Sequence, residues 1–316
     1  MKYLLLIIFY FIGHHIVNSQ SIDAVSFPQN FNIHMFNNNN NNFIKKTISF
    51  GNSDVDLNIP LVSKTNIHKY ALIIGNEDYS SFQTGLSSEV NVDYAINDAK
   101  VFSEYCEKTL GVDSKHLKLL TNATYGQMSQ AIAWIQNLSN IEDGNSEIIF
   151  YYSGHGLPDE ITKEGYLMPV DISGNNVNRG ISLKDLYKDL NKYPAERITV
   201  VLDACFSGGA RNEGLVAMKG VKINPKEDLI SSNMVVFASS SGNESSGVYR
   251  EKQHGYLTYF LLKKIQETKG NVNYKDLAEY LDYKIRKETA IIGKVQTPKV
   301  IGSRSATDQW KYWSFR

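Results

Sequence analysis

Cys205 and His155 are the two residues whose types and spacing suggest nucleophilic chemistry. Cys205 closely follows a hydrophobic run at 198–202 and precedes the flexible turn FSGG, while His155 stands between two glycines directly after EIIFYYS. A thiolate is a strong nucleophile, and an imidazole transfers protons near neutral pH. Taken singly, each has a plainer explanation, an inert buried thiol or a structural histidine in a glycine turn. Because the two lie 50 residues apart, each just past a hydrophobic strand, a Cys–His pair is the better interpretation.

The segments that must position these residues begin at about residue 69. Short apolar runs alternate there with longer runs whose apolar residues lie three and four apart, a pattern that predicts a parallel sheet covered by helices on both faces. We expect strands at 70–75, 116–120, 147–152, 198–202 and 234–238, helices at 93–110, 125–138, 183–190, 255–266 and 273–287, and an edge strand near 297–301. In such a doubly wound sheet, ligands bind beyond the carboxyl ends of the strands.

The remaining cysteine, Cys106, is expected to be inert core. It follows Ala99 and Phe102 at helical spacing and precedes Leu110, which places it on the apolar face of a helix. Two cysteines are too few for a disulfide framework or a structural zinc site. Each must therefore be explained alone.

The N-terminus has the pattern of a secretory signal peptide. Lys2 precedes an uninterrupted apolar run at 3–12, and we predict cleavage after Ser19. The alternative is a membrane anchor, but this run is shorter than the roughly 18 to 20 residues that span a bilayer. We therefore expect a secreted or extracytoplasmic protein with no stable membrane insertion after signal removal.

The chain divides into four predicted regions: a signal peptide at 1–19, a linker or pro-segment at 20–66, a main domain at 67–303 and a C-terminal tail at 304–316. The second region holds an asparagine run at 37–42 and no sustained periodicity. The chain has 33 basic and 33 acidic residues, and no basic stripe, so nucleic acid is not an expected partner. The GNE turn after the first strand is no phosphate-binding glycine motif.

Five motifs resemble one known family. They are YALIIGNEDY (70–79), NDAKVF (97–102), FYYSGHG (150–156), GYLMPVD (165–171) and VLDACFSGG (201–209). Over residues 69–301 the sequence is similar to the caspase-type cysteine peptidases of clan CD, and among them to bacterial metacaspases or orthocaspases. The His-to-Cys spacing is close to that of caspases. The resemblance implies an α/β, caspase-like doubly wound sheet of about six mostly parallel strands flanked by helices on both faces, peptide hydrolysis through a thioester, and a monomer.

The same resemblance assigns roles to the motif residues. Cys205 would attack the scissile carbonyl, and His155 would protonate the leaving amine. Backbone N–H groups of Gly156 and Cys205 would form the oxyanion hole. No third triad member is evident in the sequence, which suits a dyad.

Asp203, two residues before the nucleophile, is the main indication of specificity. A carboxylate there would attract a basic substrate residue at P1, and the resemblance adds Asp98 and Ser153 to the pocket. We therefore expect polypeptide substrates cleaved after Arg or Lys. The alternatives are a solvated helix residue for Asp98, a strand-end carboxylate capped by backbone N–H groups for Asp203, and a same-fold peptidase with another P1 residue such as Asn.

Residues 210–232 form a long polar stretch with candidate self-processing sites at Arg211, Lys219, Lys222 and Lys226. A plain solvated loop is the equal alternative. Calcium-dependent relatives have a longer acidic loop after the histidine and an aspartate where this chain has Asn212. We therefore predict no metal and no cofactor. A catalytically silent caspase-like scaffold that binds partners is the non-enzyme alternative.

Overall fold

The computed structural model describes residues 52–62, 64–85, 90–206, 233–240, 244, 246–302 and 309–316. A six-stranded sheet with the order β11-β8-β7-β3-β1-β2 forms its centre. Its strands are β1 (Lys69–Gly75), β2 (Leu117–Thr121), β3 (Glu147–Ser153), β7 (Arg197–Asp203), β8 (Met234–Ala238) and β11 (Lys299–Gly302). All neighbours pair in parallel except β11, the antiparallel edge strand. The predicted mostly parallel sheet of about six strands is confirmed.

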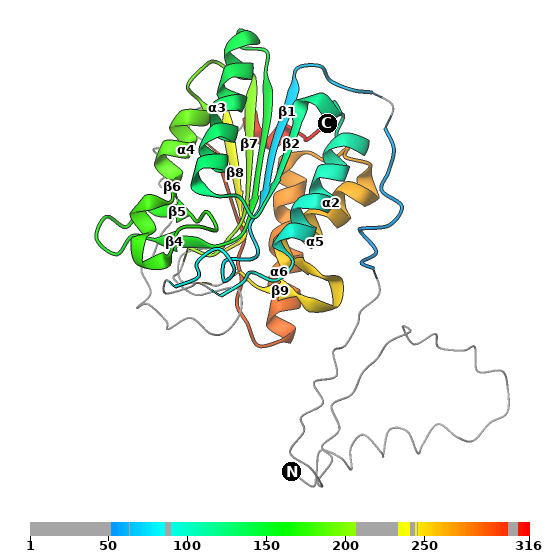
Figure 1. Ribbon diagram of the computed structural model, residues 1–316. Coiled ribbons are helices and arrows are strands. Elements are labelled where there is room, and N and C mark those ends of the chain that lie inside the picture. Colours follow the sequence, from blue (N-terminus) through cyan, green and yellow to red (C-terminus); the bar gives the residue numbers. More distant parts are fainter. Residues whose placement is uncertain are drawn as a thin grey trace, which may run out of the picture. The chain divides into compact units, whose positions relative to one another are not determined.

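Helices cover both faces of this sheet (Figure 1). α2 (Ala95–Lys108), α5 (Tyr256–Thr268) and α6 (Tyr274–Ile291) pack on one face, and α3 (Tyr125–Ile141) and α4 (Leu183–Leu190) pack on the other. Each covers the sheet with an apolar stripe, as the three- and four-residue spacing predicts. No helix in the part of the chain that the structure describes is long and apolar enough to cross a bilayer.

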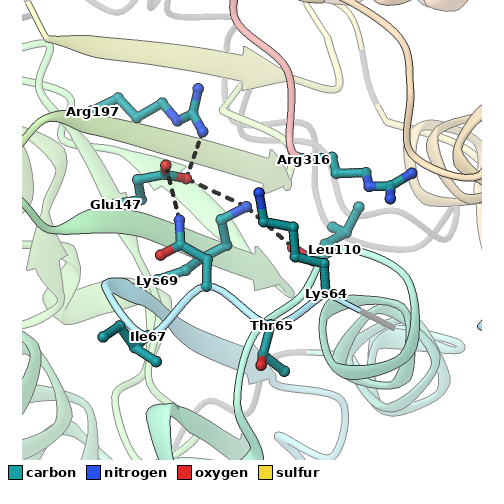
Figure 2. Close-up of a pocket in the computed structure, with 9 residues that line it drawn as sticks. Lys64, Thr65, Ile67, Lys69, Leu110, Glu147, Arg197 and Arg316 are labelled. Carbon is teal, nitrogen blue, oxygen red and sulfur yellow. Dashed lines mark hydrogen bonds and ion pairs between the residues drawn. The ribbon is translucent and has the colours of Figure 1, made fainter. Parts of the chain in front are cut away.

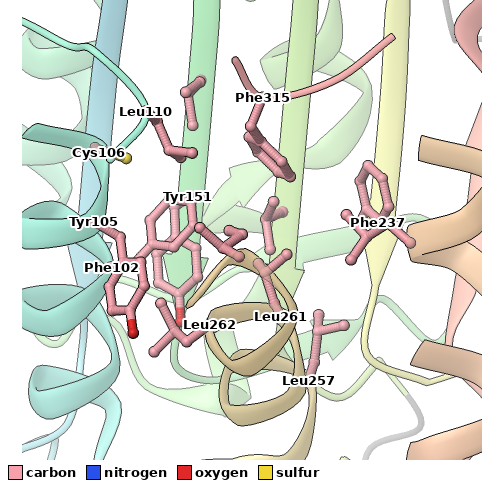
Figure 3. Close-up of a cluster of buried hydrophobic side chains, with 14 of the residues drawn as sticks. Phe102, Tyr105, Cys106, Leu110, Tyr151, Phe237, Leu257, Leu261, Leu262 and Phe315 are labelled. Carbon is pink, nitrogen blue, oxygen red and sulfur yellow. The ribbon is translucent and has the colours of Figure 1, made fainter. Parts of the chain in front are cut away.

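Strand side chains alternate between two hydrophobic cores. In β1, Ala71 and Ile73 face the α2, α5 and α6 side, whereas Leu72 and Ile74 face α3 and α4. Figure 3 shows the first core, where the ring of Phe102 on α2 stacks on Tyr151 of β3 with centroids 4.5 Å apart. Because both faces are covered, the central strands are buried along nearly their whole length.

Cys106 lies in this first core, as predicted. Its side chain is fully buried, and burial raises the pKa of its thiol far above the ordinary value, although the charge of Lys69 lowers it slightly. A thiol in such surroundings stays protonated and inert.

The packed unit extends beyond the predicted domain bounds on both sides. Val55, in the segment expected to be a linker, is fully buried, and its carbonyl accepts a hydrogen bond from the Tyr105 hydroxyl at 2.8 Å. Phe315, in the expected tail, belongs to the first core. Isolated apolar residues of this kind have no periodicity that a sequence pattern can detect. Residues 1–51, with the predicted signal peptide, lie outside the described residues.

Several short elements were not predicted. β4 (Gly156–Pro158), β5 (Gly165–Leu167) and β6 (Ile181–Ser182) form a small antiparallel sheet, and β9 (Val248–Tyr249) pairs with β10 (His254–Gly255). Short 3-10 turns are present at η1 (Ser114–His116), η2 (Gly174–Arg179), η4 (Arg250–Lys252) and η5 (Gln309–Tyr312). Strands of two or three residues are too short to show alternation.

Candidate active site

The pairing of β3 with β7 brings His155 and Cys205 to the same edge of the sheet. Ser153 on β3 pairs in register with Asp203 on β7, and His155 and Cys205 each lie two residues beyond these paired positions. The two loops also touch, because a Cβ atom built on Gly156 would lie 2.9 Å from the carbonyl oxygen of Cys205. Both side chains are nearly buried, at 3% and 4% exposure.

The imidazole of His155 is oriented by a backbone carbonyl. Its Nε2 lies 2.6 Å from the carbonyl oxygen of Val90. A carbonyl oxygen can only accept a hydrogen bond, so Nε2 carries the proton, and Nδ1 is the nitrogen that can take a proton from a thiol. The sequence indicated no third residue that would complete a catalytic triad with Cys205 and His155. The structure places the Val90 carbonyl in the orienting role, which no side-chain pattern could reveal.

Two tyrosines hold the backbone on either side of this imidazole. The Tyr79 hydroxyl accepts from the N–H of His155 at 2.9 Å, and the Tyr152 hydroxyl donates to its carbonyl at 2.8 Å. The ring of Tyr79 also packs on the imidazole, with centroids 4.5 Å apart. The Tyr79 hydroxyl donates to the carbonyl of Met168, and the Tyr152 hydroxyl shares its single proton between the carbonyls of His155 and Met168. These tyrosines lie within the quoted motifs, but their spacing alone gave no sign of this function.

The thiol of Cys205 meets the backbone of Ser246. The N–H of Ser246 points at Sγ at 2.7 Å, and the thiol donates to the Ser246 carbonyl at 3.4 Å. An N–H directed at sulfur stabilises the thiolate over the neutral thiol. Gln296 holds this segment in place, because its Oε1 accepts from the N–H of Gly247 at 2.7 Å and its Nε2 donates to the Ser239 carbonyl at 2.8 Å.

The glycines beside the histidine are required by close contacts. A Cβ on Gly154 would lie 2.6 Å from the Tyr152 hydroxyl, and one on Gly156 would lie 2.6 Å from the ring of Phe206. Any larger residue at these positions would displace the Tyr152 hydroxyl or the Phe206 ring. The SGHG motif is thus explained by packing as well as by chemistry.

The three residues predicted for the P1 pocket lie together. The Ser153 hydroxyl donates to Oδ2 of Asp98 at 2.9 Å, and Ser153 is the strand neighbour of Asp203. All three side chains are fully buried, so the alternative of a solvated Asp98 is wrong. The alternative that Asp203 is a strand-end carboxylate capped by backbone groups has structural support. Its Oδ2 accepts from the backbone N–H of Thr258 at 3.1 Å and from the Thr258 hydroxyl at 2.7 Å. An ionised carboxylate has about four acceptor sites, so capping and substrate binding are compatible.

A buried histidine balances the charge of Asp98. His254 Nδ1 lies 2.8 Å from Oδ1 of Asp98, and its Nε2 lies 2.8 Å from Oδ1 of Asp56. Burial alone would lower the pKa of His254, but the hydrogen bonds and charges of the two carboxylates outweigh burial and raise it to about 9. The imidazolium therefore persists at neutral pH.

Some predicted positions lie outside the described residues. These are the self-processing candidates Arg211, Lys219, Lys222 and Lys226, together with Asn212. Among the residues that the structure describes, no group of three or more His, Cys, Asp and Glu side chains is arranged to hold a metal ion. The absence of a cofactor remains a prediction.

A separate pocket opens at the opposite end of the sheet, beside the amino ends of the central strands (Figure 2). Lys69, Glu147 and Arg197 line it, and each is the first residue of its strand, whereas the dyad follows the strand ends. Glu147 pairs with the Lys69 ammonium at 3.3 Å and with the Arg197 guanidinium at 2.6 Å. Lys69 also donates to the Phe315 carbonyl at 2.6 Å, so this charged cluster ties the C-terminal segment to the sheet.

One family model and two solved structures are similar to this chain. The family model Peptidase_C14, described as the caspase domain, matches residues 68–308. No curated protein matches the sequence. Among solved structures, protein GSU0716 from Geobacter sulfurreducens is 17% identical with a TM-score of 0.54, over 78% of this chain and 97% of that chain. Caspase-1 from Spodoptera frugiperda is 12% identical with a TM-score of 0.49, over 77% of this chain and 90% of that chain. At 17% identity, the likeness to the Geobacter protein shows a shared fold alone.

Proposed function

Because this chain belongs to the caspase family of cysteine peptidases, we propose that it is an exported endopeptidase that hydrolyses peptide bonds after Arg or Lys. One observation carries the proposal. The parallel pairing of β3 and β7 brings the residues two positions beyond these strands, His155 and Cys205, to the end of the sheet where we expect the ligand to bind, and a hydrogen bond to the Val90 carbonyl orients the imidazole.

The reaction follows from these positions. The thiol of Cys205 gives its proton to Nδ1 of His155 while Sγ forms a bond to the scissile carbonyl carbon. The resulting oxyanion would accept from the backbone N–H groups of Gly156 and Cys205. The C–N bond then breaks as the imidazolium returns its proton to the leaving amine. Water, with the imidazole as base, hydrolyses the thioester and restores the thiol.

The preference for a basic P1 residue is supported by buried charge. Asp98 and Asp203 bring two carboxylates to one site, with the hydroxyl of Ser153 bonded to the first. A guanidinium or an ammonium would gain charge-assisted hydrogen bonds from both, whereas a P1 Asp would be repelled. All three side chains are inaccessible in this structure, so a substrate side chain reaches them only when neighbouring residues move.

Export and self-processing are further parts of the proposal. The apolar run at 3–12 followed by small residues supports a cleaved signal peptide. If the enzyme cleaves after basic residues, the bonds following Arg211, Lys219, Lys222 and Lys226 are candidate sites of self-cleavage. Intact-mass measurement of the purified wild type and of Cys205→Ala would detect both events, because only the wild type should be cut between residues 210 and 232.

The deciding experiment is cleavage of matched peptides that differ only at P1. The chain from Gln20 would be assayed with P1 Arg, Lys, citrulline, Asp and Asn, with added calcium and with a chelator. We expect cleavage after Arg and Lys to be much faster than after citrulline and absent after Asp and Asn, with rates unchanged by the chelator and activity lost in Cys205→Ala and His155→Ala. Cys106→Ala is the matched control, because that thiol lies in the core and should leave turnover intact.

Three outcomes would contradict parts of the proposal. Activity that survives in Cys205→Ala would refute the nucleophile. Preference for Asn or Asp would refute the P1 assignment and retain the peptidase. Hydrolysis of no peptide by a folded sample would favour a caspase-like binding scaffold.

A further inference from the structure

His254 joins the N-terminal segment of the packed unit to the P1 pocket. It comes from β10, its partner Asp98 comes from α2, and its other partner Asp56 comes from the segment at 52–62. The imidazole is fully buried between the two carboxylates. Ionised carboxylates only accept hydrogen bonds, so both ring nitrogens donate. We refer to these three residues as the Asp56–His254–Asp98 chain.

The Asp56–His254–Asp98 chain helps to determine which way the Asp98 carboxylate faces. Oδ1 of Asp98 accepts from Nδ1 of His254 at 2.8 Å and from the N–H of Gly255 at 3.1 Å, while Oδ2 accepts from the hydroxyl of Ser153 at 2.9 Å. The Gly255 N–H also contacts Oδ2 at 3.3 Å, so β10 reaches both oxygens, whereas Nδ1 of His254 bonds to Oδ1 and the Ser153 hydroxyl bonds to Oδ2. Without the imidazole, this fully buried carboxylate would lose its charged partner and the hydrogen bond that holds Oδ1, and it would rotate.

Neighbouring contacts hold the imidazole at this position. The hairpin that carries it is tied to α2 and to the residues just before that helix, because the Asn97 amide donates to the Gln253 carbonyl at 3.0 Å and Arg250 pairs with Asp93 at 2.9 Å. These bonds fix the distance between His254 and α2.

Asp54, two residues before Asp56, anchors the Asp56 end of the Asp56–His254–Asp98 chain. The Asp54 carboxylate pairs with Lys252 and with Lys263, each at 2.9 Å, and accepts from the hydroxyl of Tyr259 at 3.1 Å. Partial burial opposes ionisation, yet the two ammonium groups lower the pKa of Asp54 to about 2. The segment is therefore bound by charge at neutral pH, and Asp56 is held against Nε2.

We propose that His254 is a positioning residue for substrate specificity, which holds the Asp98 carboxylate in the orientation that receives a basic P1 side chain, with Asp56 orienting the imidazole in turn. The inference rests on the proposed cleavage after Arg or Lys. It assigns a function in specificity to a residue outside the motifs and to part of the segment that the sequence predicted to be a linker or pro-segment.

The test uses three variants that separate the two ends of the imidazole. His254→Asn places an amide nitrogen near the position of Nδ1 and keeps the donor to Asp98. His254→Gln places one near Nε2 and keeps only the donor to Asp56. His254→Ala removes both. Each would be measured with paired peptides carrying Arg or citrulline at P1, since citrulline has the shape of Arg without its charge.

We expect His254→Asn to retain most of the preference for Arg over citrulline. His254→Gln and His254→Ala should lower kcat/KM for the Arg peptide by about 10- to 100-fold, the worth of one hydrogen bond to a charged group. The loss should appear mainly in KM, because the pocket binds P1 without touching the scissile bond. Cleavage of the citrulline peptide should change little. The rate at which iodoacetamide alkylates Cys205 should be the same in all three variants, which shows that the nucleophile remains in place.

Equal loss in His254→Asn and His254→Gln, or an unchanged ratio of Arg to citrulline in all three variants, would overturn the inference. If the wild type cleaves no peptide, the proposed function fails, and the inference is then tested by binding alone. Calorimetry with N-acetyl-argininamide in the Cys205→Ala background should show binding that is kept with His254→Asn and lost with His254→Gln. Equal binding by both variants would refute the assignment.

Discussion

The buried imidazolium of His254 should make the stability of the protein depend on pH in the alkaline range. The perturbation is His254→Asn, made in the inactive Cys205→Ala background so that self-cleavage does not interfere. Asparagine keeps a donor toward Asp98 but has no charge to lose. The difference between the two proteins therefore isolates the titration of one group.

The magnitude follows from the two pKa values. In the folded protein the pKa is raised to about 9 by Asp98 and Asp56, against an ordinary value of 6.5. A raised value in the folded state means that the stabilisation is complete below pH 6.5 and is lost as pH rises through 9. A shift of this size corresponds to about 3 kcal/mol, with a slope of up to about 1.4 kcal/mol per pH unit inside the window.

Urea unfolding followed by circular dichroism would measure this effect. The stability advantage of the protein that retains His254 should shrink by about 3 kcal/mol between neutral pH and a pH above the folded pKa. Other groups, such as the buried Lys69 whose pKa is lowered by burial, are common to both proteins and cancel in the comparison. Parallel pH profiles for the two proteins would refute the reasoning, because they would mean that His254 is neutral in the folded state.

Three further outcomes are expected. Tyr79→Phe should keep the ring packing but leave the N–H of His155 without its hydroxyl acceptor, so kcat/KM should fall at least about fivefold. An unchanged kcat/KM would show that this hydrogen bond does not help to position His155. Gly156→Ala should abolish peptide hydrolysis while circular dichroism stays native, since its Cβ would lie 2.6 Å from an aromatic ring; wild-type turnover would show that the loop tolerates the methyl group. Iodoacetamide should modify Cys205 well before Cys106 in the native protein, as read by peptide mass mapping, and equal rates would contradict the burial of Cys106.

The sheet and its helices were largely predictable because their signal is local. The strand at 234–238 and the helix at 183–190 were predicted with the bounds that the structure has, and the other main elements differ by a few residues at their ends. Buried parallel strands are continuous apolar runs, and helices repeat their apolar residues three and four apart. The burial of Cys106 followed from the same helical spacing.

The parts that were missed depend on contacts between distant segments. The carbonyl of Val90 is a group that every residue type supplies, and the N–H of Ser246 is one that every type except proline supplies, so their positions beside the dyad leave no trace in the sequence. Asp56 and His254 are separated by 198 residues, and neither belongs to a motif. Their pairing exists only because the N-terminal segment packs beside β10.

The sequence by itself determined the identity of the candidate nucleophile and base, the order of strands and helices, and the edge of the sheet at which the chemistry would lie. These follow from side-chain chemistry and from periodicities that act over a few residues. Only the tertiary structure decided which ring nitrogen of His155 meets the Val90 carbonyl, the burial of the residues predicted for the P1 pocket and the partner of Asp98. Those properties arise from burial and from hydrogen bonds between segments that meet only after the chain has folded, when removal from water makes each unpaired polar group costly.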